Sequence, residues 1–451
     1  MVQKFKALRS RAVLSLMASA ALALVGLVSV KAQSTGATAP AAQVSSASLS
    51  ARERAEVFEK VWETIEEKYY DPSFNGVDWA AARARYRPLV EAAAGEEEFY
   101  DLLNRMAGEL RDAHTRVRSP RQNRDRKNRQ ATGAGVLIFE VEGAPVVFDV
   151  APDSEAARAG VLPGMVVRTV GGRPAAEALA EARAEVGPSS SARAALVLTY
   201  LRLIAGAPGS TLELGLTRAD GTALDVRLTR RTVSAAPRFD ARLLPSGYAY
   251  VRFDRFRPPV ADRLKEALVK FKDAPGLILD LRANGGGDGR EGLRVAGYFF
   301  DEKVSVGRVV TRTGKPPSAL FGLVSLPKVF EAGERGGRLY SNPVVVLVNE
   351  GTGSTAELIA NGLREHGRAY VIGTRSCGCV LGVLKHRELK GGGDLAVSEI
   401  GFVTPEGRRL EGEGVAPDKA VTVTLGDLQA GRDAALEEAE AYFKSLRRRP
   451  E

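Results

Sequence analysis

Two apolar runs, "GLILDLR" (276–282) and "PVVVLVN" (343–349), most constrain the fold of this chain. A strand that is apolar at nearly every position has both faces buried, as in a parallel sheet covered by helices on both sides. A glycine-rich turn and a helical pattern follow each run, "NGGGDGREGLRVAGYFF" after the first and "GTGSTAELIANGLREHG" after the second. The chain is therefore expected to form an α/β core with functional residues in the loops after its strands.

The alternation of strand and helix extends to both sides of these runs. "GYAYVRFDRF" (247–256) precedes them as a strand and "AYVIGT" (369–374) follows them. The two glycine-rich turns, Asn284 to Gly289 and Gly351 to Ser354, thus belong to the same expected sheet. Glycine lets backbone N–H groups approach a ligand closely, and a helix N-terminus leaves unpaired donors. One N–H from each turn could bind an oxyanion between them.

Each turn also has a simpler interpretation. "GGGDG" is equally typical of a tight turn or a phosphate loop, although the nucleotide motif G-x-x-x-x-G-K-[ST] is absent from the sequence. Ser354 stands before a helix, where serine most often caps the first turn. These residues alone leave open whether Ser354 is a nucleophile or a cap.

The region before this core is predicted to be helical. The segments "SARERAEVFEKVWETIEEKYYDP" (50–72), "VDWAAARARYRPLVEAA" (77–93) and "EEEFYDLLNRMAGELRDAH" (96–114) all repeat apolar residues at helical spacing. Val57, Val61 and Ile65 form such a face in the first helix. We expect His114 to end the third helix, and the charged run "RSPRQNRDRKNRQ" (118–130) to be a solvated linker.

Residues 133–232 change to short β segments and turns, closed by a hairpin around Asp220 and Gly221. The glycine-rich start, "AARAGVLPGMVV" and this hairpin resemble a PDZ domain, although "EVGPSSSARAALVLTYLRLIAGAP" (185–208) is longer than the matching segment of that fold. The resemblance implies that a peptide C-terminus is bound as an added strand. The alternative is a small β domain with a packing role only.

The N-terminus has the pattern of a secretory signal peptide. "MVQKFKALRSR" is basic, "AVLSLMASAALALVGLVSV" is apolar, and "VKA" places small residues before a cleavage site after Ala32. Residues 33–47 read as a flexible linker. The rival interpretation is an uncleaved membrane anchor. Either way, the working part is expected outside the cytoplasm, in the periplasm or secreted.

Composition limits the other function classes. At 451 residues the chain is long enough for two to four domains. Its formal net charge is +9, but five of these charges lie in residues 1–32, and the sequence has no basic stripe with interleaved aromatics, so nucleic acid is not an expected partner. Cys377 and Cys379 are its two cysteines. A bond between them would close a small strained loop, and they do not complete a zinc site, so no metal or other cofactor is expected.

The ordered motifs "DWAAARARYRPLVEAA", "ELRDAHTRV", "LILDLRANGGG", "VVVLVNEGTGSTAE" and "TPEGRRLEGEGVAPD" resemble the S41 family of serine peptidases. This group contains the C-terminal processing (tail-specific) peptidases and their tricorn-core relatives, and the likeness covers about residues 50–430. It implies an α/β catalytic domain with a crotonase- or ClpP-like β-β-α spiral. The implied domains are an N-terminal helical domain (48–120), the inserted PDZ-like β domain (133–232), the catalytic domain (238–429) and a C-terminal helix and tail (430–451).

The resemblance also implies roles for particular residues. The family nucleophile falls on Ser354, and the oxyanion donors fall on the N–H of Thr355 and on one from the Gly286–Gly287 turn. The processing peptidases use a lysine as base, but Cys379 occupies its place here, so the Ser–Lys dyad is absent. A thiol is a poor proton acceptor, and a thiolate is a nucleophile in its own right.

Another base is therefore needed, and the chain has three histidines. His366 reads as a solvated helix-end residue, and His386 is expected to point out of a hairpin. His114 matches the histidine base of the tricorn-like branch, and Glu411 matches the glutamate that orients it. That branch has a serine directly before the histidine, where this chain has Ala113. A helix-end role is the alternative for His114.

The sequence thus predicts an extracytoplasmic serine endopeptidase that acts on protein or peptide substrates, recruited by their C-termini. It would contact a membrane only if the N-terminal segment stays uncleaved. A catalytically inactive peptide-binding protein is the main alternative, because the dyad lysine is missing. A Cys379 nucleophile, or a redox switch with Cys377, is a third interpretation. The signal sequence and the PDZ-like insertion count against a crotonase-type CoA enzyme.

Overall fold

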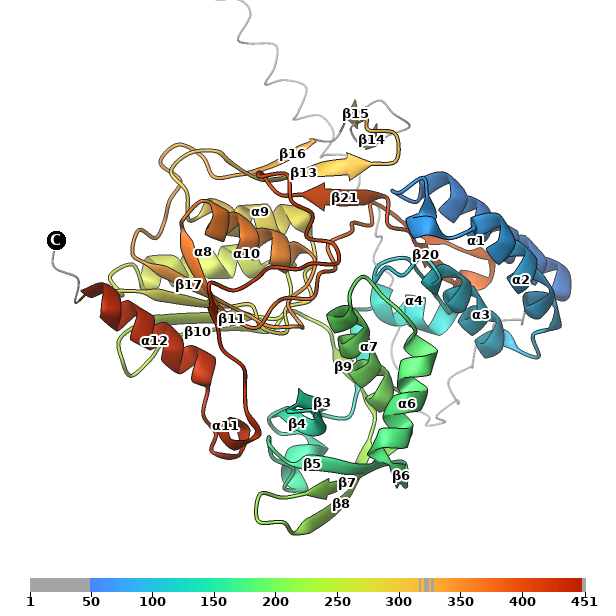
Figure 1. Cartoon of the computed structure of the whole chain (residues 1–451), viewed down its shortest axis with the longest axis horizontal. Helices are drawn as coiled ribbons and strands as arrows, with labels where there is room; N and C mark the ends of the chain where they lie inside the picture. Colours follow the sequence, from blue (N-terminus) through green and yellow to red (C-terminus); the bar gives the residue numbers. More distant parts are fainter. Residues whose placement is uncertain (1–48, 316–317, 320–323, 326–327, 448–451) are drawn as a thin grey trace, which may run out of the picture. The chain divides into compact units, whose positions relative to one another are not determined.

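The computed structural model describes residues 49–315, 318–319, 324–325 and 328–447 (Figure 1). The predicted signal peptide (1–32) and the predicted linker (33–47) lie outside the described residues. In the described part of the chain, no helix is both long enough and apolar enough to cross a membrane.

A six-stranded sheet forms the centre of the C-terminal region, and it contains the four strands predicted from the sequence. Five neighbouring strands run parallel, and the edge strand β10 pairs antiparallel with β11. The register places Asp280 at the end of one strand opposite Leu347 of the next, so the turns that follow both strands leave from one edge of the sheet. In spatial order the strands are β10 (Phe239–Leu243), β11 (Ala249–Phe253), β12 (Leu277–Asp280), β17 (Val344–Val348), β18 (Ala369–Gly373) and β22 (Lys419–Ala420).

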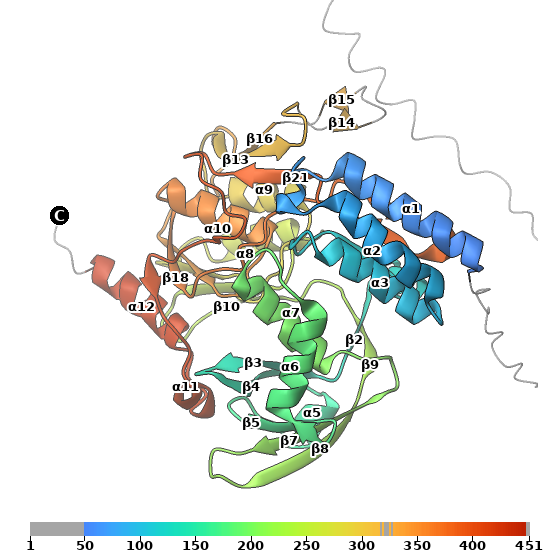
Figure 2. The ribbon, with the colours of Figure 1, turned by 45° about the vertical axis from the view of Figure 1, so that its right-hand side comes forward.

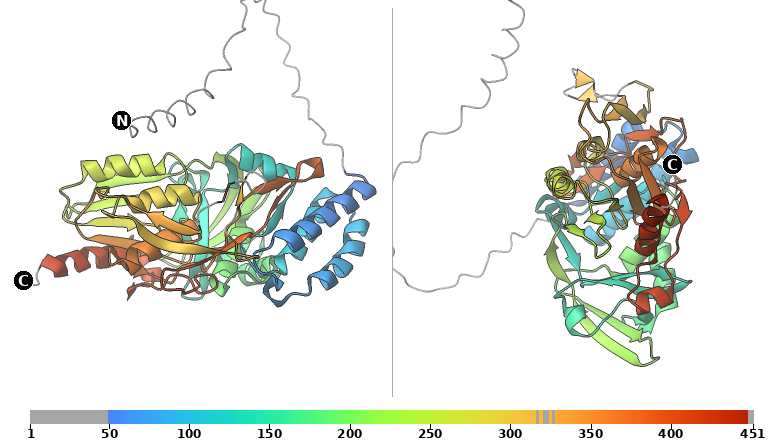
Figure 3. Two further views of the ribbon diagram at one scale, coloured as in Figure 1. Left: turned by 90° about the horizontal axis from the view of Figure 1, so that it is seen from above. Right: turned by 90° about the vertical axis from the view of Figure 1, so that its left-hand side faces the viewer.

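Helices cover both faces of this sheet, which is why its central strands are apolar throughout. Leu277, Leu279 and Val346 face a core with α8 (Val260–Lys270), α9 (Gly289–Gly297) and α10 (Thr355–Glu365). Ile278 and Val345 face α12 (Ala434–Arg447), which Figure 3 shows in red on the opposite side of the sheet from α8. The strands and the glycine turns that lead into α9 and α10 confirm the predicted mixed α/β core.

The three predicted N-terminal helices are also present, as α1 (Ala51–Lys68), α2 (Trp79–Ala92) and α3 (Glu96–Gly108). A capping box of Ser50 and Glu53 starts α1. The predicted face of Val57, Val61 and Ile65 is buried between the helices. Their core also receives side chains from much later in the chain, namely Leu381, Leu389, Leu395 and Val397. The helices thus share their core with this part of the C-terminal region.

The charged run 118–130 is not a solvated linker, so that prediction is wrong. β1 (Arg116–Arg118) pairs with β20 (Asp394–Ala396), which also pairs with β19 (His386–Glu388). A helix, α4 (Pro120–Lys127), follows and is capped by Ser119. The buried Asp394 forms ion pairs with Arg118 at 2.8 Å and Arg126 at 3.5 Å. His386 contacts the same carboxylate, with Nδ1 at 3.0 Å from its oxygen, and is therefore not a free hairpin side chain.

Residues 133–232 form a second sheet with two helices against it (Figure 2). The short strands β2 (Gln130–Gly133) and β9 (Arg231–Ser234) pair with each other and so join the two ends of this region. The long segment noted in the sequence folds into the second of two adjacent helices, α6 (Ala175–Val186) and α7 (Ala192–Ile204). The sheet consists of β3 (Val136–Val141), β4 (Ala144–Val150), β5 (Val166–Val170), β6 (Arg173–Pro174), β7 (Thr211–Thr217) and β8 (Ala223–Thr229), with α5 (Glu155–Arg158) after β4. The β7–β8 hairpin around Asp220 and Gly221 is confirmed.

The remaining elements lie outside the two six-stranded sheets. They are η1 (Phe74–Gly76), β13 (Val304–Thr311), β14 (Ser318–Ala319), β15 (Val324–Ser325), β16 (Val329–Ala332), η3 (Lys390–Gly392), β21 (Ile400–Val403) and α11 (Leu425–Gln429). β13 lies between β16 and β21 in a three-stranded antiparallel sheet that packs onto the same core as α10.

Candidate active site

Ser354 lies at the N-cap position of α10, but its conformation is not that of an ordinary capping serine. A capping serine has an extended backbone and accepts a hydrogen bond from the first turn. The backbone of Ser354 instead has φ 54° and ψ −124°, and its hydroxyl accepts no cap hydrogen bond. A non-glycine residue in such a conformation is costly and persists only where its surroundings enforce it, which is typical of nucleophile turns. Ser354 is therefore not an ordinary capping serine, although Glu357 accepts its N–H as the third helical residue of a capping box does.

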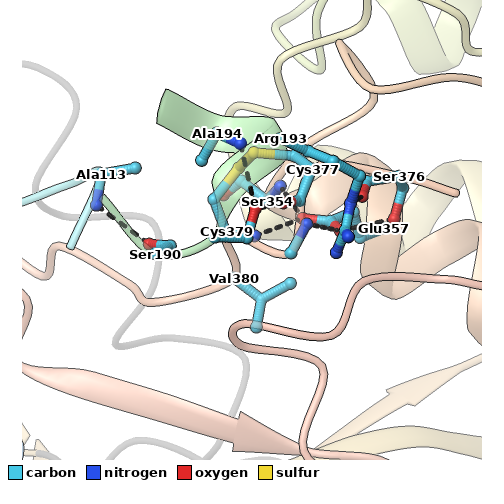
Figure 4. Close-up of a disulfide and its surroundings, with 12 residues drawn as sticks. Ala113, Ser190, Arg193, Ala194, Ser354, Glu357, Ser376, Cys377, Cys379 and Val380 are labelled. Atoms are coloured by element: carbon cyan, nitrogen blue, oxygen red, sulfur yellow. Dashed lines mark hydrogen bonds between the residues drawn. A yellow bond between two sulfur atoms is a disulfide. The ribbon is translucent and has the colours of Figure 1, made fainter. Parts of the chain in front are cut away.

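A buried carboxylate holds this turn in place. Glu357, in the first turn of α10, has no exposed surface and accepts the N–H of Ser354 at 3.0 Å (Figure 4). The same carboxylate accepts the N–H of Cys379 at 3.0 Å, the N–H of Gly378 at 2.7 Å and the hydroxyl of Ser376 at 2.6 Å. The N–H of Ser354 also points to the carbonyl oxygen of Cys379, at 3.0 Å. Glu357 thus joins the Ser354 turn to the 376–379 loop.

The two glycine-rich turns meet at Ser354, as the sequence predicts. The N–H of Gly353 donates to the carbonyl of Asn284 at 2.9 Å, and the hydroxyl of Thr355 donates to the carbonyl of Gly287 at 2.9 Å. Gly286 has φ +91°, and a Cβ atom added there would lie 2.6 Å from the Cβ atom of Ser354. Only glycine therefore allows the first turn to approach the second this closely.

The predicted oxyanion donors need one correction. The N–H of Gly286 is not free, because it donates to the side-chain oxygen of Asn284 at 3.0 Å. Neither the N–H of Gly287 nor that of Thr355 has an acceptor within the residues that the structure describes. The two unpaired donors thus come one from each turn, which is the arrangement that an oxyanion hole requires.

Gly286→Ala is expected to lower kcat for peptide hydrolysis by about 100-fold, because the new Cβ atom separates the two turns and misplaces an oxyanion donor. Gly285→Ala is the matched control in the same loop, since a Cβ atom there would have no neighbour within 4 Å. Steady-state kinetics of both variants checks this. Equal kcat values for the two would contradict the close approach.

Cys379 lies beside Ser354, but its sulfur is bonded to that of Cys377. Both cysteines of the chain are used in this disulfide, so neither is a free thiol. The disulfide gives no support to a Cys379 nucleophile. Glu357 and the two sulfur atoms lie within 4.8 Å of one another, but the sulfurs are joined and the carboxylate already accepts four hydrogen bonds. The three residues have no free thiolate to offer a metal ion.

His114 does not end a helix, so that prediction is wrong. α3 ends at Gly108, and His114 lies in the following loop, where Asp112 accepts the backbone N–H groups of His114 and Thr115 at 2.7 Å each. The Nδ1 atom of His114 is buried and has no hydrogen-bond partner. Burial, reinforced by the charge of Arg116, lowers the pKa of His114 to about 4. The ring is thus neutral at neutral pH, and its burial disfavours the charged form.

Glu411 contacts the loop that contains Cys379 at the two residues that follow those bound by Glu357. Its carboxylate accepts the N–H groups of Val380 at 2.7 Å and Leu381 at 3.2 Å. Burial raises the pKa of Glu411 to about 7, although a hydrogen bond from the Ser190 hydroxyl opposes this. Glu411 lines a cavity of about 300 Å³. Other residues that line it are Tyr70, Arg111, Phe402 and Arg409.

The three candidate relay residues all lie near one loop, but no direct hydrogen bonds within the described chain connect them to one another. Ser354 contacts this loop at Cys379, Glu411 contacts it at Val380, and Ala113, the neighbour of His114, packs against the disulfide. Among the described residues, no hydrogen bond joins the His114 ring to Ser354 or to Glu411. The other two histidines are occupied elsewhere, since His366 contacts the carbonyl of Ser305 and His386 contacts Asp394.

Sequence reasoning did not find Ser190, Ser191 and Arg193, which reach this loop from the start of α7. The hydroxyl of Ser191 donates to the carbonyl of Cys377, and Arg193 donates to the carbonyl of Ser376 at 2.7 Å. Their only signal in the sequence is the unusual length of residues 185–208. Serines before a helix read as caps, and Ser191 does also cap α7 through the N–H of Ala194.

Comparison with known proteins agrees with the predicted resemblance. Residues 247–421 match the model of peptidase family S41, and residues 50–108 match the model of the tricorn protease C1 domain. The carboxyl-terminal-processing peptidase 2, chloroplastic, of Arabidopsis thaliana is 28% identical over 386 residues, which cover 80% of this chain and 68% of that protein. The carboxyl-terminal-processing protease of Picosynechococcus sp. is 27% identical over 384 residues, which cover 80% and 82%.

A solved structure gives the same result at the level of the fold. The photosystem II D1 C-terminal processing protease superposes with a TM-score of 0.56 at 25% identity, over 82% of this chain and 93% of that one. The range matched to the S41 model contains Ser354, both glycine turns and Glu411. Residues 247–421 of this chain are thus similar to peptidase family S41, a family of serine-type peptidases, and the relatives named above are carboxyl-terminal-processing proteases.

Proposed function

We propose that this chain is an endopeptidase that cleaves protein or peptide substrates through an acyl-enzyme at Ser354. The observation that carries the proposal is the unusual backbone conformation of Ser354, with φ 54° and ψ −124°, between two turns that each offer an unpaired N–H donor. The Ser354 hydroxyl attacks the scissile carbonyl, and the N–H groups of Gly287 and Thr355 stabilise the oxyanion that forms. Water then hydrolyses the ester and releases the second product.

In this proposal His114 takes the proton of Ser354 and gives it to the leaving amine, and Glu411 orients the imidazole and stabilises its charged form. Support comes from the neutral, unpartnered ring of His114 and from the position of Glu411 on the loop that also contacts Ser354. Hydrogen bonds of a catalytic relay are often long in the absence of substrate and tighten when it binds.

We further propose that residues 133–232 act as a PDZ-like domain that recruits substrate C-termini, and that the central sheet and its helices are crotonase-like. The β3–β8 sheet with its closing hairpin supports the first assignment, and the alternation of parallel strands and helices supports the second. The basic, apolar N-terminal pattern supports an extracytoplasmic location, with residues 1–32 removed.

A catalytically inactive peptide-binding protein is the second candidate, and one observation favours it. The disulfide-bonded Cys379 stands where the resemblance expects a lysine base, and no hydrogen bond within the described residues replaces the dyad.

A serine-reactive phosphonate separates the two candidates. We expect it to form one covalent adduct, on the peptide that contains Ser354, and to block cleavage of an unstructured protein such as casein. Mass spectrometry locates the adduct, and gel electrophoresis follows the cleavage. Binding of peptides without an adduct and without cleavage would instead establish the inactive protein.

A further inference from the structure

The connection between α6 and α7 is fixed onto the loops that carry the candidate site. Besides its bond to Ser376, the guanidinium of Arg193 donates to the carbonyls of Glu413 at 2.7 Å and Gly412 at 3.2 Å, which directly follow Glu411. Ala194 packs against the disulfide of Cys377 and Cys379. The inserted region thus contacts the candidate site through this connection, as Figure 4 shows for Ser190, Arg193 and Ala194.

Within this connection, Ser190 has two partners that belong to two different parts of the proposed relay. Its hydroxyl oxygen accepts the backbone N–H of Ala113 at 3.0 Å. Ser190 also lines the same cavity as Glu411 and lowers the pKa of that carboxyl as a hydrogen-bond donor does. A serine hydroxyl has one donor and two acceptor sites, so it can serve both partners at once. Ser190 therefore connects the proposed orienting carboxylate to the peptide that directly precedes the proposed base.

We propose that Ser190 is a positioning residue of the catalytic relay, supplied by the inserted region, which fixes Glu411 relative to the peptide of His114. The inference rests on the proposed roles of Ser354, His114 and Glu411. Its chemical basis is that the side chain of Ala113 has no hydroxyl to make this connection itself. A hydrogen bond to an ionised carboxylate is also among the stronger ones, so its loss disturbs both the charge and the orientation of Glu411.

The connection predicts a change in pH dependence. The Ser190 hydroxyl stabilises the ionised form of Glu411, so its removal raises the pKa of Glu411 further above its ordinary value. If ionised Glu411 is needed, the acid limb of kcat/KM then moves to higher pH. The other charged or titratable groups around Glu411 are unchanged by this substitution; they are Tyr69, Tyr70, Arg111, Asp112, Glu357 and Arg409.

The test compares Ser190→Ala with Ser190→Thr, which keeps the hydroxyl, and with Ser189→Ala. The hydroxyl of Ser189 is buried but has no hydrogen-bond partner, so it is the matched control. We expect Ser190→Ala to lower kcat at pH 7 about tenfold, with KM little changed and the acid limb shifted to higher pH. Ser190→Thr and Ser189→Ala should keep the kcat and the pH profile of the unsubstituted protein.

Two results would overturn the inference while the proposed function stands. One is an unchanged kcat and pH profile in Ser190→Ala. The other is a loss of activity with an unmoved acid limb, which would make the contact with Glu411 structural only. Failure of the proposed function is distinguishable, because the unsubstituted protein would then neither cleave casein nor react with the phosphonate.

Discussion

Ser354→Ala and His114→Ala are each expected to lower kcat by about 10⁴-fold, and the double variant should be no slower than either alone. Residues that act as one relay lose nearly all of their effect when the first is removed, so their effects are far from additive. The remaining rate would come from substrate binding and from the unpaired N–H groups of Gly287 and Thr355. Steady-state hydrolysis of a fluorogenic peptide measures all three variants.

His366→Ala is the matched control for His114. His366 lies at the end of α10, where Nε2 is 2.8 Å from the carbonyl oxygen of Ser305, so its substitution should leave kcat within about twofold. Full activity of His114→Ala together with an inactive Ser354→Ala would refute the proposed base but keep the nucleophile. Multiplicative losses in the double variant would show that the two residues act independently.

Glu357→Ala is expected to reduce the free energy of unfolding by about 3–5 kcal/mol, because it leaves three buried donors without an acceptor and removes one of the two acceptors of the Ser354 N–H. The three donors are those of Ser376, Gly378 and Cys379, while the carbonyl of Cys379 still accepts the N–H of Ser354. Burial raises the pKa of Glu357, and these hydrogen bonds oppose that shift by favouring the ionised carboxylate. The variant should also be inactive, since the carboxylate holds the Ser354 turn. Urea denaturation followed by circular dichroism gives the change in stability.

Glu350→Ala provides the control in the preceding turn, since Glu350 is only half-buried and makes no side-chain hydrogen bond within the described chain. Its unfolding free energy should change by less than about 0.5 kcal/mol. Glu357→Gln should lie between the two, because the amide keeps one acceptor oxygen but turns an NH₂ group toward the other donors. A Glu357→Ala variant as stable as Glu350→Ala would show that water satisfies the three donors.

The parts of this fold that local pattern determines were predictable from sequence. The strands around Leu279 and Val346 have side chains buried on both faces. Such burial requires an apolar residue at nearly every position, and this run is visible in the sequence. The glycine turns were also predictable, because the close approach of Gly286 to Ser354 requires a residue without a side chain. The candidate site residues on these turns came from the same local signals together with the family resemblance.

The features that could not be predicted depend on contacts that no local sequence pattern shows. The run 118–130 appeared solvated because the acid that neutralises Arg118, Asp394, is 276 residues away. His114 was expected on a helix because nothing in its spacing shows that Asp112 forms hydrogen bonds to the following backbone N–H groups. Ser190 contacts Ala113 across 77 residues, and no period in the sequence records such a contact.

The paired strands β2 and β9 join the two ends of the inserted region, while Arg193 attaches its middle to the carbonyls of Ser376, Gly412 and Glu413. For protein engineering, this region is therefore not an exchangeable module. Grafting a different peptide-binding domain at the β2–β9 junction would change the recruited substrate, but it would also remove the guanidinium that holds the backbone after Glu411. A working chimera must keep the Ser190–Ala194 segment, whatever sheet is placed around it.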